Sequence, residues 1–361
     1  MTTTTTGRRT EIDPARLDEL VGRIIGDLGA TFGAGCTLLG DRLGLYRALA
    51  DHGPLTPEEL ADSTSTSVTY LRPWLAQQGA GGYVDYDPAT RTWSMNPEQV
   101  ATLADPDGPA FFAGAMELVL GTLRDVPTIE KRFRDGGGFG WHEHDRDLFT
   151  GTERFFRPGY IANLVSEWLP ALEGVTEKLT RGSRVLDVGC GHGASTVLMA
   201  QAYPRSTFTG VDYHEASITV ARRRAEDAGV ADRVTFSVAD ASHLPPVSAD
   251  LVAMFDCLHD MGDPEAAVRA SRNVLADDGT LMVVEPLAGD LVEDNLNPLG
   301  RVFYGASTLI CTPASLAQPG GRALGTQAGP TRLLKVLTDG GFGRARVATT
   351  GPVNLVLEAR P

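Results

Sequence analysis

The sequence is short of positive charge. Its 32 lysines and arginines stand against 46 aspartates and glutamates, which leaves a net charge of −14. Nucleic acids and anionic membranes are bound by clustered positive charge, so this balance argues against both as partners. No apolar run approaches the roughly 18 residues of a membrane span, and residues 1–12 have no apolar segment like that of a signal peptide. We therefore predict a soluble, cytoplasmic protein with a disordered tail over residues 1–12.

Paired cysteines are also missing. The four cysteines are far apart and form no CxxC pair, which excludes a zinc ribbon. Disulfide scaffolds are typical of small secreted domains, so we do not expect one in a chain of 361 residues. A free cysteine is most often a small buried apolar residue. We expect Cys36, Cys190, Cys257 and Cys311 to be reduced.

The first part of the chain has the pattern of a winged helix. Its length of 361 residues predicts two domains. Apolar residues recur at helical spacing over 13–50, Thr56 and Pro57 mark a helix start, and a further helix is expected near 67–78. Alternating residues over 83–95 then predict a hairpin. Together these elements predict a mostly helical winged-helix domain over 13–100.

The charge of this domain decides between two functions for it. Residues 41–100 contain eight acids and four arginines, and the helix that would read DNA carries only Arg72 and is expected to be interrupted by Pro73. A protein that reads phosphates and base edges needs more positive charge than this. We interpret the domain as a dimerisation module and expect a homodimer. The alternative is a winged-helix transcription regulator that uses the second domain to sense a ligand.

The second half predicts an α/β domain. After a helical connector over 101–180, which contains a glycine-rich loop at 135–144, strands alternate with helices from residue 183 onward. The continuously apolar strands predict a Rossmann-like, doubly wound and mostly parallel sheet in a domain over 181–361. The long segment 287–330 interrupts the alternation and is expected to be a lid. The predicted strands are 184–188, 207–212, 234–238, 251–255, 280–284, 344–349 and 353–359.

A glycine-rich turn follows the first of these strands. The segment Asp187-Val-Gly-Cys-Gly-His-Gly193 lets a ligand approach the backbone at a helix N-terminus. It matches neither the GxGxxG dinucleotide fingerprint nor a P-loop. Asp212 ends the second strand, where a carboxylate can accept both ribose hydroxyls, and Asp240 follows the third strand. Each aspartate could instead only cap the next helix.

This constellation resembles the class I S-adenosylmethionine (SAM) methyltransferases over residues 183–361, and with the winged helix nearly the whole chain is similar to small-molecule methyltransferases whose N-terminal domain dimerises. The resemblance implies SAM as cofactor, a seven-stranded sheet with its last strand antiparallel, and an acceptor from specialised metabolism. It also implies a set of cofactor-binding residues: Asp187, Gly189, Gly191, Gly193, Asp212, Tyr213, Asp240, Ala241, Asp256 and Cys257.

The segment Asp256–Pro264 is similar to a motif of O-methyltransferases. In those enzymes the histidine at the position of His259 is the general base that deprotonates the acceptor hydroxyl, and a histidine pKa of about 6.5 suits that role. The resemblance thus implies that His259 is catalytic, with Asp260 beside it. A histidine that only packs or caps is the alternative.

A second chemistry remains open at the same residue. A few relatives, the α-keto acid C-methyltransferases, use a metal to chelate the acceptor, which stabilises the enolate as it forms. Here a divalent or trivalent metal ion would be bound by His259, His144 and Glu285, with Cys311 as a further candidate. His142, Arg301 and Tyr304 are candidate substrate contacts, although Arg301 could equally form a structural salt bridge. An inactive subunit that does not bind SAM is a third reading of the chain.

Overall fold

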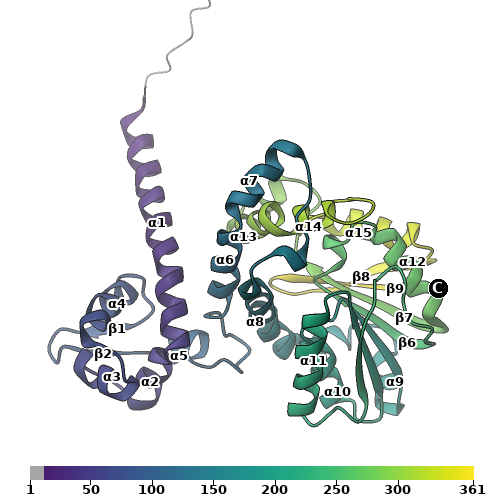
Figure 1. The fold of residues 1–361 in the computed structure, drawn as a ribbon, viewed down its shortest axis with the longest axis horizontal. Coiled ribbons are helices and arrows are strands. Elements are labelled where there is room, and N and C mark those ends of the chain that lie inside the picture. Colours follow the sequence, from purple (N-terminus) through teal and green to yellow (C-terminus); the bar gives the residue numbers. More distant parts are fainter. Residues whose placement is uncertain (1–11) are drawn as a thin grey trace, which may run out of the picture. The chain divides into compact units, whose positions relative to one another are not determined.

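Residues 12–361 are described by the structure, a computed structural model in which the chain forms two compact units divided between Asp105 and Pro106 (Figure 1). The predicted tail over 1–12 lies, except for Ile12, outside the described residues. The helices between residues 115 and 181, which the sequence suggested as a connector, are part of the second unit.

The first unit is a set of helices followed by a short hairpin, as the winged-helix prediction requires. Thr56 and Glu59 form a capping box at the start of α3, and Leu55 bridges to Trp93 beside the hairpin. The elements are α1 (Pro14–Arg42), α2 (Leu45–His52), α3 (Pro57–Thr64), α4 (Val68–Ala80), β1 (Asp85–Asp87), β2 (Thr92–Ser94) and α5 (Pro97–Leu103).

Pro73 does not interrupt its helix, contrary to the sequence-based expectation. A proline removes one backbone donor and crowds the preceding turn, but α4 continues past it to Ala80. Leu71 and Trp74, on either side of the proline, and the next residue, Leu75, are all buried. Burial of this apolar face therefore outweighs the local cost of the proline.

The N-terminal part of α1 carries an uncovered apolar surface. The buried residues of α1 begin only at Gly33. Before that point, large apolar side chains are between 44% and 75% exposed, and no described residue of the first unit covers them. They are Leu17, Leu20, Val21, Ile24, Ile25, Leu28 and Phe32.

The second unit is built on a seven-stranded sheet in the order β5-β4-β3-β6-β7-β9-β8. All neighbouring strands are parallel except at β9, which runs antiparallel to both β7 and β8. The predicted sheet with an antiparallel last strand is thus confirmed. The strands are β3 (Arg184–Val188), β4 (Thr207–Asp212), β5 (Val234–Val238), β6 (Ala249–Phe255), β7 (Leu275–Pro286), β8 (Arg344–Thr350) and β9 (Asn354–Arg360).

Helices cover both faces of this sheet. The apolar faces of α9 (Val175–Arg181), α10 (Ala194–Ala202) and α11 (Glu215–Asp227) share one buried cluster with the strands, and those of α12 (Pro264–Val274) and α15 (Gly329–Asp339) share a second. Two buried clusters, one on each face of a mostly parallel sheet, define a doubly wound α/β fold.

Two further helical segments lie at the carboxyl ends of the strands. The first contains α6 (Ala115–Arg124), α7 (Val126–Asp135), the short turn Trp141–Glu143 and α8 (Arg146–Asn163), which continues into a π-helical turn at Leu164–Trp168. The second contains a short turn at Glu293–Asn295, then α13 (Pro298–Ala306), a π-helical turn at Ser307–Cys311 and α14 (Thr312–Leu316).

The glycine-rich loop before Trp141 packs against the second of these segments. A Cβ at Gly138 would stand 2.0 Å from the backbone nitrogen of Ala317, and the Phe139 amide donates to the Pro313 carbonyl at 2.8 Å. Glycine is needed here because two backbones touch. The loop therefore holds the segment after Cys311 in place.

Candidate active site

The three glycines after β3 serve different purposes. Gly189, Gly191 and Gly193 all have positive φ, between 51° and 75°, a region that other residues enter only with strain. A Cβ at Gly189 would meet Cys257 Sγ at 2.8 Å, and one at Gly193 would meet Phe236 at 2.7 Å. A Cβ at Gly191 would meet nothing within 4 Å, so this glycine alone faces open space.

Asp187 lies beneath the loop and does not reach the cavity. Its side chain is fully buried, and one carboxylate oxygen accepts hydrogen bonds from Ser195 Oγ at 2.7 Å and Thr196 Oγ1 at 2.6 Å. Burial raises the pKa of Asp187 to about 6, against the effect of the two hydroxyl donors. The carboxylate ties the first turn of α10 to the end of β3.

Asp212 supports the same loop from the end of β4. Its Oδ2 accepts a hydrogen bond from the Gly191 amide at 3.0 Å, and Oδ1 accepts from the His214 amide at 2.9 Å. Burial raises the pKa of Asp212. Asp212 lines the cavity beside Gly191.

The third predicted acid, Asp240, is more exposed. It follows β5 by two residues and accepts hydrogen bonds from the hydroxyl and the amide of Ser242, which lower its pKa. Asp240, Ala241 and the half-exposed Tyr213 all line the cavity.

Asp256 follows β6 in a strained conformation. It is one of the few non-glycine residues in the described part of the chain with positive φ, at 49°, and such strain is concentrated at functional sites. Its carboxylate accepts hydrogen bonds from Tyr160 Oη at 2.9 Å and Asn354 Nδ2 at 2.8 Å. Burial, with the nearby charge of Glu285, raises the pKa of Asp256 to about 8. The adjacent Cys257 also lines the cavity.

These residues surround a cavity of about 520 Å³ at the carboxyl edge of the sheet, where doubly wound folds bind ligands. Six of the described residues that line it are acidic, and none is lysine or arginine. The acidic residues are Glu153, Asp212, Asp240, Asp256, Asp260 and Asp263.

Several lining residues were not found from the sequence. Phe149, Phe156 and Tyr160 come from one face of α8, and Trp141 and Gln318 come from the two segments above the sheet. Aromatic residues at helical spacing indicate only a buried face, so no sequence signal distinguished these residues from core positions.

His259 is buried directly behind the cavity wall. The ring is 3% exposed, and Nδ1–H donates to Glu285 Oε2 at 2.5 Å, while Nε2 lies 3.2 Å from Asp260 Oδ1. Burial favours the neutral ring, but the carboxylates of Glu285 and Asp260 outweigh it and hold the pKa of His259 well above its usual value. Asp260 lines the cavity and His259 does not.

His144 is not brought to His259 as the predicted metal site required. Its Nδ1 bonds Asp125 at 2.7 Å, and its ring packs edge-on against Phe139. Among the described residues, the three side chains placed to hold an ion are His259, Asp260 and Cys311. Glu285 bonds the far nitrogen of His259 instead of joining this group.

The three predicted substrate contacts lie outside the cavity wall. His142 is exposed on the turn Trp141–Glu143, with its ring 6.1 Å from that of Tyr213. Arg301 is exposed and Tyr304 half-buried on α13. None of the three is among the described residues that line the cavity.

Two family models match this chain. Residues 179–322 match a methyltransferase domain, and residues 34–105 match the Rv2258c-like winged HTH domain. The second unit thus contains a segment that matches a methyltransferase domain, and the first unit contains one that matches a winged-helix domain.

Curated relatives match in part of their length. The chain is 39% identical over 105 residues to 27-O-demethylrifamycin SV methyltransferase of Amycolatopsis mediterranei, which is 28% of this chain and 38% of that protein. It is 32% identical over 144 residues to methyltransferase GfsG of Streptomyces halstedii, 38% of this chain and 51% of that protein. The chain thus spans about half or less of the length of these relatives.

Solved structures share the whole fold. The mitomycin 7-O-methyltransferase MmcR superposes with a TM-score of 0.67 at 20% identity, covering 97% of this chain and 100% of that chain. Human N-acetylserotonin methyltransferase in complex with SAM superposes with a TM-score of 0.68 at 19% identity, covering 98% and 99%. None of the helices in the described part of the chain is long and apolar enough to cross a membrane.

Proposed function

We propose that this chain is an enzyme that transfers the methyl group of SAM to a small molecule bound in the cavity. The observation that carries the proposal is the conjunction of Gly191 and Asp212 at the cavity wall. Gly191 leaves open space beside a loop that Asp212 orders through the Gly191 amide. The residues present fit SAM because a backbone free of side chains and a carboxylate at the end of the second strand are what a nucleoside requires.

The charge of the cavity fits the same ligand. SAM supplies an electrophilic methyl group on a positively charged sulfonium. The acidic wall, with no lysine or arginine among its described residues, favours a cation. Asp256 and Tyr160 hold each other by a hydrogen bond at the end of β6. We assign to this pair the positioning of the donor, since orientation of the two reactants is the main contribution a protein makes to such a transfer.

The first candidate chemistry is O-methylation without a metal. The rifamycin relative and the mitomycin neighbour are O-methyltransferases by name. Asp260 lines the cavity and lies against His259, which Glu285 orients from behind. In this chemistry Asp260 is the general base that takes the proton of the acceptor hydroxyl, and His259, held protonated between Glu285 and Asp260, orients that carboxylate.

The second candidate chemistry is methyl transfer to carbon, as for an α-keto acid. One specific observation favours it: ligand atoms of His259, Asp260 and Cys311 lie within 4.8 Å of one another, and Asp260 lines the cavity. A β-carbon proton is too weakly acidic for a histidine alone, and a chelated keto acid forms its enolate more readily.

We also propose that the chain works as a homodimer assembled through α1. The apolar surface of Leu17 to Phe32 is uncovered in its own unit, and a continuous apolar helix face of this size marks a protein interface. In a twofold dimer this surface would pair with the same surface of the second copy, in a self-complementary contact.

Calorimetric titration of the purified chain with SAM tests the enzyme proposal. We expect one SAM to bind per chain. In Asp212→Ala we expect the affinity for SAM to fall about 10- to 150-fold, because a hydrogen bond to a charged group is worth about 1.5–3 kcal/mol. Asp232→Ala is the control, since Asp232 is exposed and pairs only with its neighbour Arg233 among the contacts described. Absence of SAM binding by the wild type would contradict the proposal. Binding of DNA in its place would favour the regulator.

A further inference from the structure

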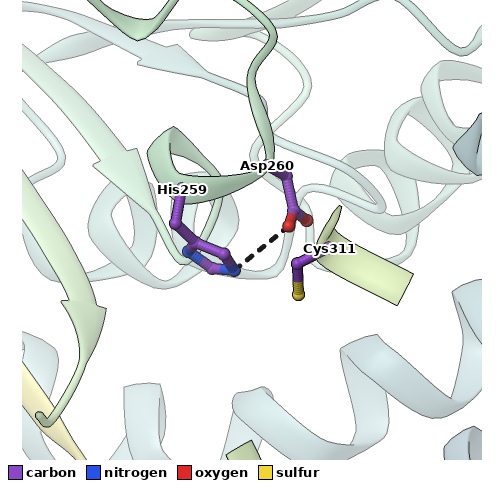
Figure 2. Close-up of side chains that lie close together, drawn as sticks. All are labelled: His259, Asp260 and Cys311. Carbon is purple, nitrogen blue, oxygen red and sulfur yellow. Dashed lines mark ion pairs between the residues drawn. The ribbon is translucent and has the colours of Figure 1, made fainter. Parts of the chain in front are cut away.

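His259, Asp260 and Cys311 meet at one point from two distant parts of the chain. His259 and Asp260 stand on the short turn after β6, and Cys311 ends the π-helical turn Ser307–Cys311. One ligand atom from each lies within 4.8 Å of the other two. Their side chains point toward one another in Figure 2, and the residues are only 3%, 7% and 4% exposed.

The atoms of this group that point away from the meeting point are all satisfied. His259 Nδ1 donates to Glu285, whose other oxygen accepts from the Leu258 amide at 2.9 Å. Asp260 Oδ2 accepts from Trp141 Nε1 at 2.9 Å. A ligating histidine held by a carboxylate through its second nitrogen, and a ligating carboxylate held by a donor, are the usual outer contacts of a protein metal site.

The atoms that point inward face one another. Asp260 Oδ1 is buried and makes no hydrogen bond in the described structure. His259 Nε2 faces it at 3.2 Å (Figure 2), and the Cys311 sulfur completes the group. A buried carboxylate oxygen without a donor needs another source of positive charge. Either a proton on His259 supplies it, or a metal ion does.

We propose that His259, Asp260 and Cys311 bind a divalent metal ion of the zinc type. One imidazole, one carboxylate and one thiolate are ligands that Zn²⁺ and its neighbours accept, and three protein ligands leave a fourth position open, as in catalytic sites. The ligand set differs from the one that the sequence suggested, because Cys311 and Asp260 take the places of His144 and Glu285.

We infer that the open position faces the cavity, because Asp260 and the following Met261 line it. If the proposed methyl transfer is correct, this position receives the acceptor, and a metal that expands to five-coordinate there binds best a molecule with two adjacent oxygens. The acceptor class is then a chelating one, an α-keto acid or a catechol. A metal on Nε2 replaces the proton of the metal-free chemistry, so the two are exclusive.

The test uses the full chain, stripped of metal and titrated with Co²⁺. We expect one Co²⁺ per chain and a thiolate-to-cobalt charge-transfer band. Cys311→Ser removes the band, and Cys36→Ser, at a half-buried cysteine of the first unit, keeps it. Glu285→Gln keeps the band but lowers the affinity for Co²⁺ by about 10- to 100-fold, as expected when a group that hydrogen-bonds a metal ligand is changed.

Two further measurements make the outcome decisive. Calorimetry with SAM on the metal-free protein shows that each variant is folded, and it tests methyl-donor binding independently of the metal. SAM binding without stoichiometric Co²⁺, or a thiolate band that persists in Cys311→Ser, overturns the metal site alone. Pyruvate and catechol are then added separately to the Co²⁺ protein. If neither compound changes the cobalt spectrum, the chelating acceptor class is overturned.

Discussion

Gly191→Ala separates a binding role of the glycine loop from a purely structural one. Gly191 has φ of 51°, and its missing side chain would point into open space in the wall of the cavity. Alanine is strained at positive φ, which costs roughly 1–2 kcal/mol of stability. If SAM fills that space, the added methyl also overpacks the bound state by about 1–3 kcal/mol, which weakens binding between about 5- and 150-fold.

Gly229→Ala is the matched control. Gly229 lies in the same unit, after α11, with φ of 66° and nothing within 4 Å of a built Cβ. Its backbone strain is therefore comparable, but it is not among the residues that line the cavity. Urea unfolding of both variants measures the strain, and SAM calorimetry measures the binding.

We expect both variants to lose similar stability and only Gly191→Ala to lose SAM affinity. Equal SAM affinities in the two variants, at equal losses of stability, would refute the assignment of this space to the methyl donor. A much larger stability loss in Gly191→Ala would show instead that the loop needs this glycine for folding.

Two predictions concern stability and assembly. Burial raises the pKa of Asp187 from 3.8 to about 6, so its ionisation destabilises the folded state as pH rises from about 4 through 6. The free energy of unfolding of Asp187→Asn, relative to that of the wild type, should therefore rise by roughly 3 kcal/mol between pH 4 and pH 7.5. Urea unfolding at a series of pH values measures this difference, and a difference that does not change with pH would contradict the prediction. On α1, Leu20→Glu with Ile24→Glu places two charges on the exposed apolar face and should convert a dimer to monomers in sedimentation at unchanged SAM affinity. A variant with Arg23→Ala is the control, and a double-glutamate variant that stays dimeric would exclude this face as the interface.

The parts of the fold that are encoded locally could be predicted from the sequence. The apolar strands, the glycine turn after Val188 and the acids at strand ends each depend on a few consecutive residues. For this reason Asp212 and Asp240 were expected at the sheet edge, and both line the cavity. Strand limits were less well predicted: β7 begins at Leu275, whereas the predicted strand begins at residue 280.

Contacts between distant segments could not be predicted in this way. The proximity of Cys311 to His259 depends on the path of the segment after β7, and the bond from Trp141 to Asp260 joins residues 119 positions apart. The same reason explains the error at His144, whose ring packs against Phe139 and bonds Asp125 instead of reaching His259. Residue type indicated metal ligands, and only the packing selected among them.

The acidic cavity wall links the two open questions, the acceptor and the metal. Two of its acids, Asp212 and Asp256, have raised pKa values, which lessens the negative charge but does not reverse it. The cationic donor is stabilised there, whereas an anionic acceptor such as a keto acid or a phenolate is repelled unless a cation accompanies it. No lysine or arginine among the described lining residues can supply that cation. We therefore expect the proposed metal at His259, Asp260 and Cys311 to favour an anionic acceptor, because without it the positive charge beside Asp260 is the protonated His259 behind the wall. Metal content and acceptor charge are thus expected to be linked: a bound metal favours an anionic acceptor, and a metal-free cavity favours a neutral or cationic one.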